Sequence, residues 1–188
     1  MAALTLLIIR HAEKPGEDWP GPGLTLDGTP DANSLVIRGW QRAGAWAALF
    51  GAGFGAAAYP APTAVYAADP NAPAGEGVSK RPYETAVPLA DRLFGTTPNT
   101  TYAQGNEKAL VQALLGLSGV VLVAWEHKAI VESLVPLIPI SSGTPPTHWN
   151  GSRYDVVLRF DRPDGATGFA FTELFPMLLS GDSDKPLH

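Results

Sequence analysis

The strongest constraint on the fold of this chain is a pair of aliphatic runs, each of which ends near a histidine. Residues 4–9 (Leu-Thr-Leu-Leu-Ile-Ile) stop at Arg10-His11, and residues 120–125 (Val-Val-Leu-Val-Ala-Trp) end two positions before His127. Runs of this length and composition are typical of parallel strands that are buried on both faces. Functional side chains in such sheets gather at the carboxyl ends of the strands. If the two strands are parallel neighbours, both imidazoles meet at one edge of the sheet.

Strand-like and helical patterns alternate along the rest of the chain, which is typical of α/β proteins. The predicted helices cover residues 35–50, 82–94, 106–115 and 129–137, and the other predicted strands cover residues 63–67, 154–160 and 169–174. The last two strands are joined by a turn at residues 161–165 (Asp-Arg-Pro-Asp-Gly) and are expected to form an antiparallel edge. We therefore predict an α/β three-layer sandwich with a mostly parallel central sheet, an antiparallel edge, and helices on both faces.

The length of 188 residues predicts a single domain, because a chain of this size can bury one substantial core and is short for two. Three irregular segments, residues 19–33, 70–78 and 141–150, are expected to line the entrance to a site. Residues 180–188 are predicted to be a loosely held tail.

Composition excludes several classes of function. The net charge of −5 means that the molecule as a whole attracts neither nucleic acid nor an anionic membrane, so any anion needs a local basic pocket. The absence of cysteine excludes disulfides, thiolate metal sites and cysteine catalysis. No run of about 18 apolar residues could span a bilayer, and the N-terminus lacks the features of a secretory signal. A cytoplasmic protein is the default expectation, while 18 prolines and 20 glycines would also suit a secreted protein whose leader has been removed.

Arg10 and His11 are residue types suited to phosphoryl transfer. An imidazole is a usable nucleophile near neutral pH, and a guanidinium holds a phosphate through two charge-assisted hydrogen bonds. Arg81 stands at the entrance of the predicted helix 82–94, where free backbone N–H groups and the helix dipole also stabilise a phosphate. The sequence therefore contains the parts of a phosphate pocket.

Four separated segments resemble motifs of the histidine phosphatase (phosphoglycerate mutase-like) superfamily, and they occur in the order that the family requires. Residues 10–13 (Arg-His-Ala-Glu) resemble its Arg-His-Gly/Ala-Glu signature. Residues 39–43 (Gly-Trp-Gln-Arg-Ala) resemble its Gly-x-x-Gln-Ala helix, with Arg42 in place of the glutamine, and residues 81–86 (Arg-Pro-Tyr-Glu-Thr-Ala) resemble its Arg-Ala-x-x-Thr-Ala segment. The fourth element is the strand that ends before His127. The resemblance runs from about residue 4 to residue 160.

This resemblance implies a set of site residues and a mechanism. In that family the first histidine is phosphorylated, and two arginines and the second histidine surround the phosphoryl group; these roles fall on His11, Arg10, Arg81 and His127. The implied activity is that of a metal-independent phosphatase, which hydrolyses small phosphorylated substrates through a phosphohistidine on His11 without a cofactor. A mutase is a less favoured variant, because nothing in the sequence indicates a lid that would exclude water. The natural substrate and the oligomeric state are left open.

The proton donor to the leaving group is also left open. Glu126 is the first candidate because it adjoins His127, but successive strand residues point to opposite faces, which argues against both reaching one phosphate. Glu107 and Glu84 are rivals, and some relatives of this type have no dedicated donor.

Two other classes of function fit parts of the sequence. A binding module would keep the basic pocket, with weak turnover or none. A metal-dependent hydrolase would use His11, Glu13 and His127 as ligands, but His-x-Glu spacing is a weak signal and two arginines beside a cation are unfavourable. The phosphatase interpretation accounts for all four segments.

Overall fold

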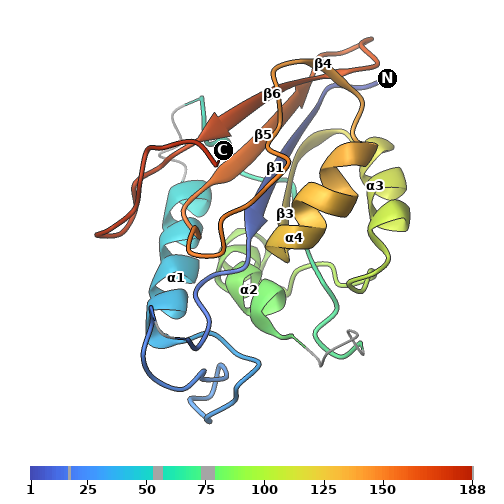
Figure 1. The fold of residues 1–188 in the computed structure, drawn as a ribbon. Helices are drawn as coiled ribbons and strands as arrows, with labels where there is room; N and C mark the ends of the chain where they lie inside the picture. Colours follow the sequence, from blue (N-terminus) through green and yellow to red (C-terminus); the bar gives the residue numbers. More distant parts are fainter. Residues whose placement is uncertain (17, 53–56, 73–78, 188) are drawn as a thin grey trace.

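A six-stranded sheet runs through the molecule and carries helices on both faces (Figure 1). The computed structural model describes residues 1–16, 18–52, 57–72 and 79–187. The strands are β1 (Leu4–Arg10), β2 (Ala64–Ala67), β3 (Gly119–Trp125), β4 (Ile140–Ser142), β5 (Val157–Arg162) and β6 (Phe169–Leu174). Their order across the sheet is β2-β3-β1-β5-β6-β4. Most of the predicted loop 70–78, residues 73–78, lies outside the described ranges.

The pairing of the strands confirms the predicted fold class. β1, β3 and β2 are parallel, as crossover connections through helices require, whereas β5 is antiparallel to both β1 and β6. The β5–β6 connection turns at Gly165, whose φ of 76° favours glycine. The chain is thus a mixed α/β sandwich in which the parallel strands place their carboxyl ends at one edge.

The alternating side chains of β1 supply both hydrophobic cores. Leu6 and Ile8 pack on one face, with apolar residues of the helical segments that flank β3. Leu7 and Ile9 pack on the other face, with apolar residues of the first two helices, among them Trp46. Because every second residue of a strand points to the same side, a strand buried on both faces must be apolar throughout. The continuous run at residues 4–9 is explained by this double burial.

The helices divide between the two faces of the sheet (Figure 1). α1 (Ile37–Gly51) and α2 (Arg81–Phe94) cover one face, and α3 (Glu107–Leu115) and α4 (His127–Ala129) cover the other. α4 continues into a π-helical turn (Ile130–Leu134) and a 3-10 turn (Val135–Leu137). The helix predicted at residues 129–137 therefore begins two residues earlier, because the Glu126 carboxylate accepts a hydrogen bond from Ala129 N and caps the first turn.

Two strand predictions differ from the structure. The strand predicted at residues 154–160 begins only at Val157, because Tyr154 and Asp155 make contacts outside the sheet. The short strand β4 lies in a segment whose proline, glycine and serine content predicts a loop. β4 pairs with β6 over only three residues, which is too short to leave a periodic signal in the sequence.

The C-terminal segment (residues 180–187) packs against the body of the protein, whereas its composition predicts a loose tail. Asp182 is paired with Arg42 on α1, and Leu187 is buried at 4% exposure. Leu187 N also donates to the Glu173 carboxylate. These partners lie far away in the sequence, so composition alone does not reveal them.

None of the helices in the described part of the chain combines the length and the apolar character needed to cross a bilayer.

Candidate active site

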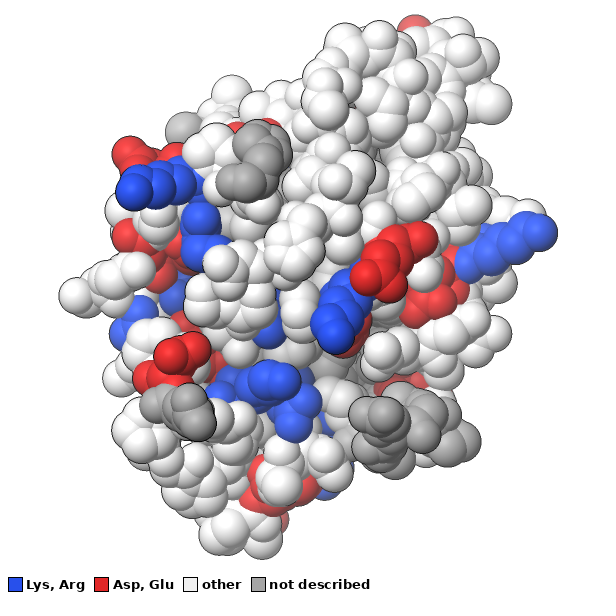
Figure 2. All heavy atoms as spheres, in the orientation of Figure 1, with Lys and Arg blue, Asp and Glu red and all other residues white. Residues whose placement is uncertain are grey.

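The register between β1 and β3 brings the two predicted strand ends together. Arg10 pairs with Trp125 across the parallel ladder, and His11 N donates to Trp125 O at 2.9 Å. His11 directly follows β1 and His127 comes two residues after the end of β3, so both histidines lie at the same edge of the sheet. Lys and Arg side chains also gather near the middle of the face that Figure 2 shows, on a largely uncharged background.

His11 is held as a neutral imidazole. The residue is buried at 4% exposure, and its Nδ1 lies 2.7 Å from Ala12 O. Burial, followed by the positive charge of Arg10, lowers the pKa of His11 well below its usual range. Because a carbonyl oxygen can only accept, Nδ1 carries the proton and the lone pair lies on Nε2. Nε2 is the ring atom that can act as a nucleophile.

Arg10 is buried at 1% exposure and is fixed by contacts on three sides. Its Nη1 donates to Gly151 O at 2.7 Å and to Arg153 O at 2.8 Å, and its guanidinium lies 3.8 Å from the centroid of the Tyr154 ring. Within the described residues, Arg10 Nε has no partner. Burial lowers the pKa of Arg10, but a guanidinium remains charged at neutral pH. Arg10 therefore offers an ordered cation with an unused donor.

Arg81 is the first residue of α2, and a hydrogen-bonded threonine ties that helix to the His11 loop. Thr85 Oγ1 accepts from Ala12 N at 2.8 Å and donates to Arg81 O at 2.7 Å. Arg81 Nη2 donates to Ala32 O, while Arg81 Nε is buried without a partner among the described residues. The charge of Arg81 contributes to the lowered pKa values of both His11 and Arg10, which indicates that the three groups are close.

His127 follows β3 and contacts the carboxylate beside it. Its Nδ1 lies 2.5 Å from Glu126 Oε1. The side chain of His127 is 12% exposed, so it is far less isolated from water than a core residue. The contact is a short approach without hydrogen-bond geometry, because His127 Nδ1 has no hydrogen-bond partner among the described residues.

The structure corrects the expectation that Glu126 and His127 point to opposite faces. Alternation applies only within a strand, and β3 ends at Trp125. Burial opposes ionisation of Glu126, but the contacts with His127 and with the backbone N–H groups of Ala129 and Lys128 outweigh it and hold its pKa at about 2. Glu126 is therefore ionised at neutral pH, which argues against the predicted role as proton donor.

The two rival carboxyl groups are also committed elsewhere. Glu84 accepts from Ser34 Oγ at 2.7 Å and from Leu35 N at 2.9 Å, so it anchors the segment before α1. Glu107 accepts from Trp125 Nε1 at 3.0 Å and from Gly105 N at 2.9 Å. Burial raises the pKa of Glu84, yet its oxygens face these donors. Both side chains are held by structural partners, and Glu107 also lines a cleft beside Glu126.

Glu13 joins the His11 loop to α1 through contacts with two arginines. Its side chain is fully buried, and Oε1 accepts from Arg42 Nε at 2.9 Å and Arg42 Nη2 at 2.8 Å. Arg38 Nε lies 3.3 Å from the same oxygen. A carboxylate engaged by two guanidinium groups is poorly suited to ligate a cation, which argues against the metal-site hypothesis. Gly39 permits this packing, because a Cβ there would lie 2.5 Å from Glu13 O.

Sequence reasoning missed the residues that hold Arg10. Tyr154 contacts both Arg10 and His11, with a centroid distance of 6.1 Å to the imidazole, but the sequence predicts only a strand residue there. The carbonyl oxygens of Gly151 and Arg153 carry no sequence signal, because any residue supplies one. The exchange of the motif's glutamine for Arg42 is the single sequence feature that points to the Glu13 contacts.

A cleft of about 410 Å³ opens beside Glu126. Its lining includes Gln104, Glu107 and Lys128 as well as Glu126. The cleft adjoins the β3 end of the site through Glu126 and Lys128, whereas Arg10, His11, Arg81 and His127 are not among its lining residues.

Comparisons with known proteins bear on the fold. No family model matches the sequence, and no curated protein matches it. Among solved structures, one titled "Mycobacterial hydrolase 2" is similar over 92% of this chain and 90% of that chain, with a TM-score of 0.50 and 15% sequence identity. At this identity the likeness concerns the fold alone, and it extends over nearly the whole of both chains.

Proposed function

We propose that this protein is a metal-independent phosphatase, which hydrolyses phosphate esters through a phosphohistidine intermediate on His11. The observation that carries the proposal is the state of His11: it is buried, neutral, and protonated on Nδ1, which leaves Nε2 as the nucleophile. Arg10 and Arg81 supply positive charge beside it. A protein of similar fold is titled a hydrolase, which agrees with hydrolytic chemistry.

The reaction divides into two displacements at phosphorus. In the first, His11 Nε2 attacks the phosphoryl group and the bond from phosphorus to the leaving oxygen breaks. In the second, water attacks phospho-His11, the N–P bond breaks, and inorganic phosphate is released with the lone pair restored on Nε2. Arg10, Arg81 and His127 neutralise the equatorial oxygens, whose charge must be stabilised in both transition states.

The proposal assigns no carboxylic acid to the leaving group. Glu126 is ionised and bonded to the α4 turn, and Glu84 and Glu107 have partners of their own. The leaving oxygen therefore takes its proton from solvent water, and the hydroxide so formed is neutralised by the proton that the attacking water releases in the second displacement. Such a site favours esters whose leaving groups depart readily, for example aryl phosphates.

Trapping the phosphoenzyme tests this function directly. The wild-type protein is mixed with 4-nitrophenyl phosphate in the presence of a chelator, quenched in base, and its mass and phosphorylated peptide are determined. We expect one added phosphoryl group on His11, stable to base and labile to acid, and no adduct in His11→Ala. The control is His148→Ala, because His148 is an exposed histidine remote in sequence from both strand ends. Phosphorylation of another residue, or activity that the chelator abolishes, would overturn the proposal.

A second candidate function is a phosphate-binding module with weak turnover or none. This alternative is favoured because all three candidate carboxyl groups, those of Glu84, Glu107 and Glu126, contact other residues of the protein. The same experiment separates the two, because a binding module would bind inorganic phosphate or vanadate tightly and form neither nitrophenol nor phosphohistidine.

A further inference from the structure

One short segment of the chain supplies all the contacts described above for the guanidinium of Arg10. Gly151 and Arg153 accept its two hydrogen bonds through their backbone carbonyls, and the ring of Tyr154 covers it at 3.8 Å. These residues follow Arg10 by more than 140 positions. The orientation of Arg10 therefore depends on where this distant segment is held.

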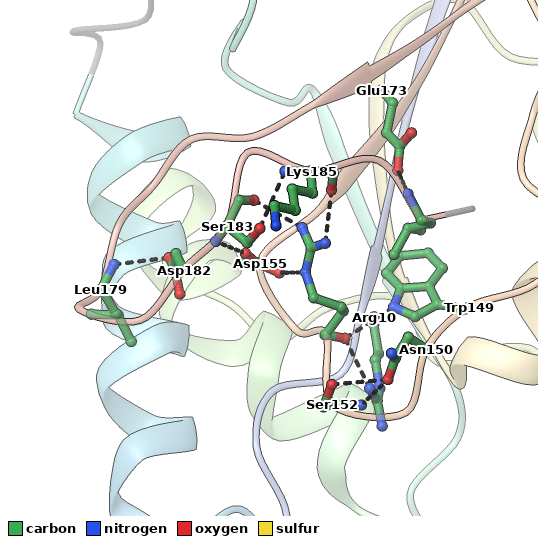
Figure 3. A network of polar contacts seen from close by, with 12 residues as sticks. Arg10, Trp149, Asn150, Ser152, Asp155, Glu173, Leu179, Asp182, Ser183 and Lys185 are labelled. Carbon is green, nitrogen blue, oxygen red and sulfur yellow. Dashed lines mark hydrogen bonds and ion pairs between the residues drawn. The ribbon is translucent and has the colours of Figure 1, made fainter.

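The side chain of Arg153 anchors that segment to the C-terminal segment. Figure 3 shows Ser183 and Lys185 of the C-terminal segment beside Asp155. Arg153 Nη1 donates to Lys185 O at 2.7 Å, and Nη2 donates to Ser183 O at 2.8 Å. Its Nε is paired with Asp155 at 2.7 Å, and the other oxygen of Asp155 accepts from Ser183 N. The Arg153 side chain is only 15% exposed, and its bonds to Ser183 O and Asp155 are partly buried, whereas the bond to Lys185 O is exposed.

A second set of contacts joins the C-terminal segment to Glu13, the last residue of the segment 10–13 that begins with Arg10. Asp182 is paired with Arg42 at 2.7 Å, and Arg42 in turn is paired with Glu13. The C-terminal segment thus reaches Arg10 through Arg153 and reaches Glu13 through Arg42. Both sets of contacts therefore end within residues 10–13, the segment that contains His11.

We propose that Arg153 is a positioning residue, which holds Arg10 in its phosphate-binding orientation by fastening residues 151–154 to the C-terminal segment. The inference rests on the proposed function, because the value of a fixed Arg10 lies in the phosphate that it binds. If the guanidinium is already ordered before phosphate binds, binding does not have to include the loss of its conformational entropy. The affinity for phosphate is higher as a result.

The chain contains a matched control for this residue. Arg159 is also paired with the aspartate two positions later, Asp161, and also donates to two backbone carbonyls of a distant loop, those of Ala57 and Ala58. Its exposure, 20%, is close to that of Arg153. No contact of Arg159 with Arg10 or His11 is present in the described structure, so Arg159→Gln reports the structural cost of losing such an arginine.

The test compares Arg153→Gln with Arg159→Gln by two readouts. The first is the NMR signal of the Arg10 Nε–H group, assigned by its loss in Arg10→Lys, which reports the order of the guanidinium without any turnover. The second is the dissociation constant of inorganic phosphate, measured by calorimetry. In Arg153→Gln we expect a shifted or broadened Arg10 signal and phosphate binding weakened about tenfold, the free energy of roughly one net hydrogen bond. In Arg159→Gln we expect both readouts unchanged.

The outcomes are distinguishable. Equal changes in the two variants, or an unchanged Arg10 signal in Arg153→Gln, would overturn the positioning role. If the wild-type protein binds no phosphate, the proposed function fails, and the NMR comparison still decides whether Arg153 orders Arg10. Should Arg153→Gln not fold, Arg153→Lys serves instead, because lysine keeps the charge but lacks the fork that reaches both carbonyls. A shift of the Arg10 signal in that variant supports the inference, and an unchanged signal contradicts it.

Discussion

β1 and β3 each deliver a histidine to the same edge of the sheet, but His11 is buried against a backbone carbonyl whereas His127 is partly exposed against a carboxylate. Burial and the charge of Arg10 keep His11 neutral, and the carbonyl of Ala12 places the ring proton on Nδ1; His127 Nδ1 instead lies 2.5 Å from the Glu126 carboxylate. Two imidazoles at neighbouring strand ends thus acquire different chemistry from their nearest neighbours. The first is suited to attack, and the second is suited to stabilise charge.

The largest expected effect is that of removing the nucleophile. His11→Ala should reduce turnover of 4-nitrophenyl phosphate by on the order of 10⁴-fold or more, because the covalent route is lost. Steady-state kinetics in the presence of a chelator measure this. If His11→Ala were no more damaging than the equivalent change at His127, the division of roles between the two histidines would be wrong.

Removal of the second histidine should be less severe. His127→Ala is expected to lower turnover by about 10²- to 10³-fold, the usual cost of one group that stabilises charge in a transition state. Rapid-quench experiments should still detect phosphorylated His11, formed slowly. Complete absence of the phosphoenzyme would show that His127 takes part in the first displacement in a way that charge stabilisation does not explain.

The support beneath the His11 loop is the next feature to test. Thr85→Val removes the acceptor for Ala12 N, which is buried, and should lower the free energy of unfolding by about 1–3 kcal/mol. The control is Thr63→Val, since Thr63 makes similar bonds with Val120 but is exposed and lies at the other end of β3. Denaturant unfolding compares the two, and equal losses would mean that the Thr85 bonds have no special importance.

The neutrality of His11 can be measured by titration. Because burial and Arg10 lower its pKa, the ring resonances of His11 should titrate with a midpoint well below 6.5. The unfolded chain takes up that proton as the pH falls below about 6.5 while the folded chain does not, so stability should decline there, and His11→Ala should reduce the slope. A midpoint above about 7 would leave His11 mostly protonated at neutral pH and contradict its role.

The smallest expected effect concerns Glu126. Glu126→Gln should lower turnover only several-fold, and by the same factor for alkyl and aryl phosphates, because an ionised carboxylate cannot protonate a leaving group. A much larger loss with the alkyl ester would restore Glu126 as the proton donor. The carboxylate's low pKa also predicts a contribution to stability that is present above about pH 4.5 and is lost as the pH falls towards 2; Glu126→Gln should remove it.

The sequence predicted the sheet well because its strongest signals are those of doubly buried strands. The hydrophobicity of residues 4–9 and 120–125 alone predicts β1 and β3, and a histidine follows each run in the sequence. The register places the two strand ends side by side. The weaker predictions concern places where long-range contacts override local pattern. Tyr154 leaves the expected strand to cover Arg10, and the helix predicted from residue 129 begins at His127 because Glu126 caps α4.

The candidate site could be predicted only as far as its charged and imidazole groups. Arg10, His11, Arg81 and His127 are residue types with evident chemistry, and they were named from the sequence. The groups that set their state are backbone carbonyls, such as Ala12 O and Arg153 O, and no pattern of side chains marks a carbonyl. The same holds for the C-terminal segment, whose partners on Arg153 and α1 come together only in the folded chain.

The parallel register of β1 and β3 has a consequence for engineering. Residues 4–10 pair one to one with residues 119–125, so a single inserted residue in either strand would turn its side chains to the wrong face and separate the two strand ends. When segments are exchanged between proteins of this fold, β1 and β3 must therefore be exchanged together. Insertions that lengthen the chain are best confined to surface turns such as the one between β5 and β6.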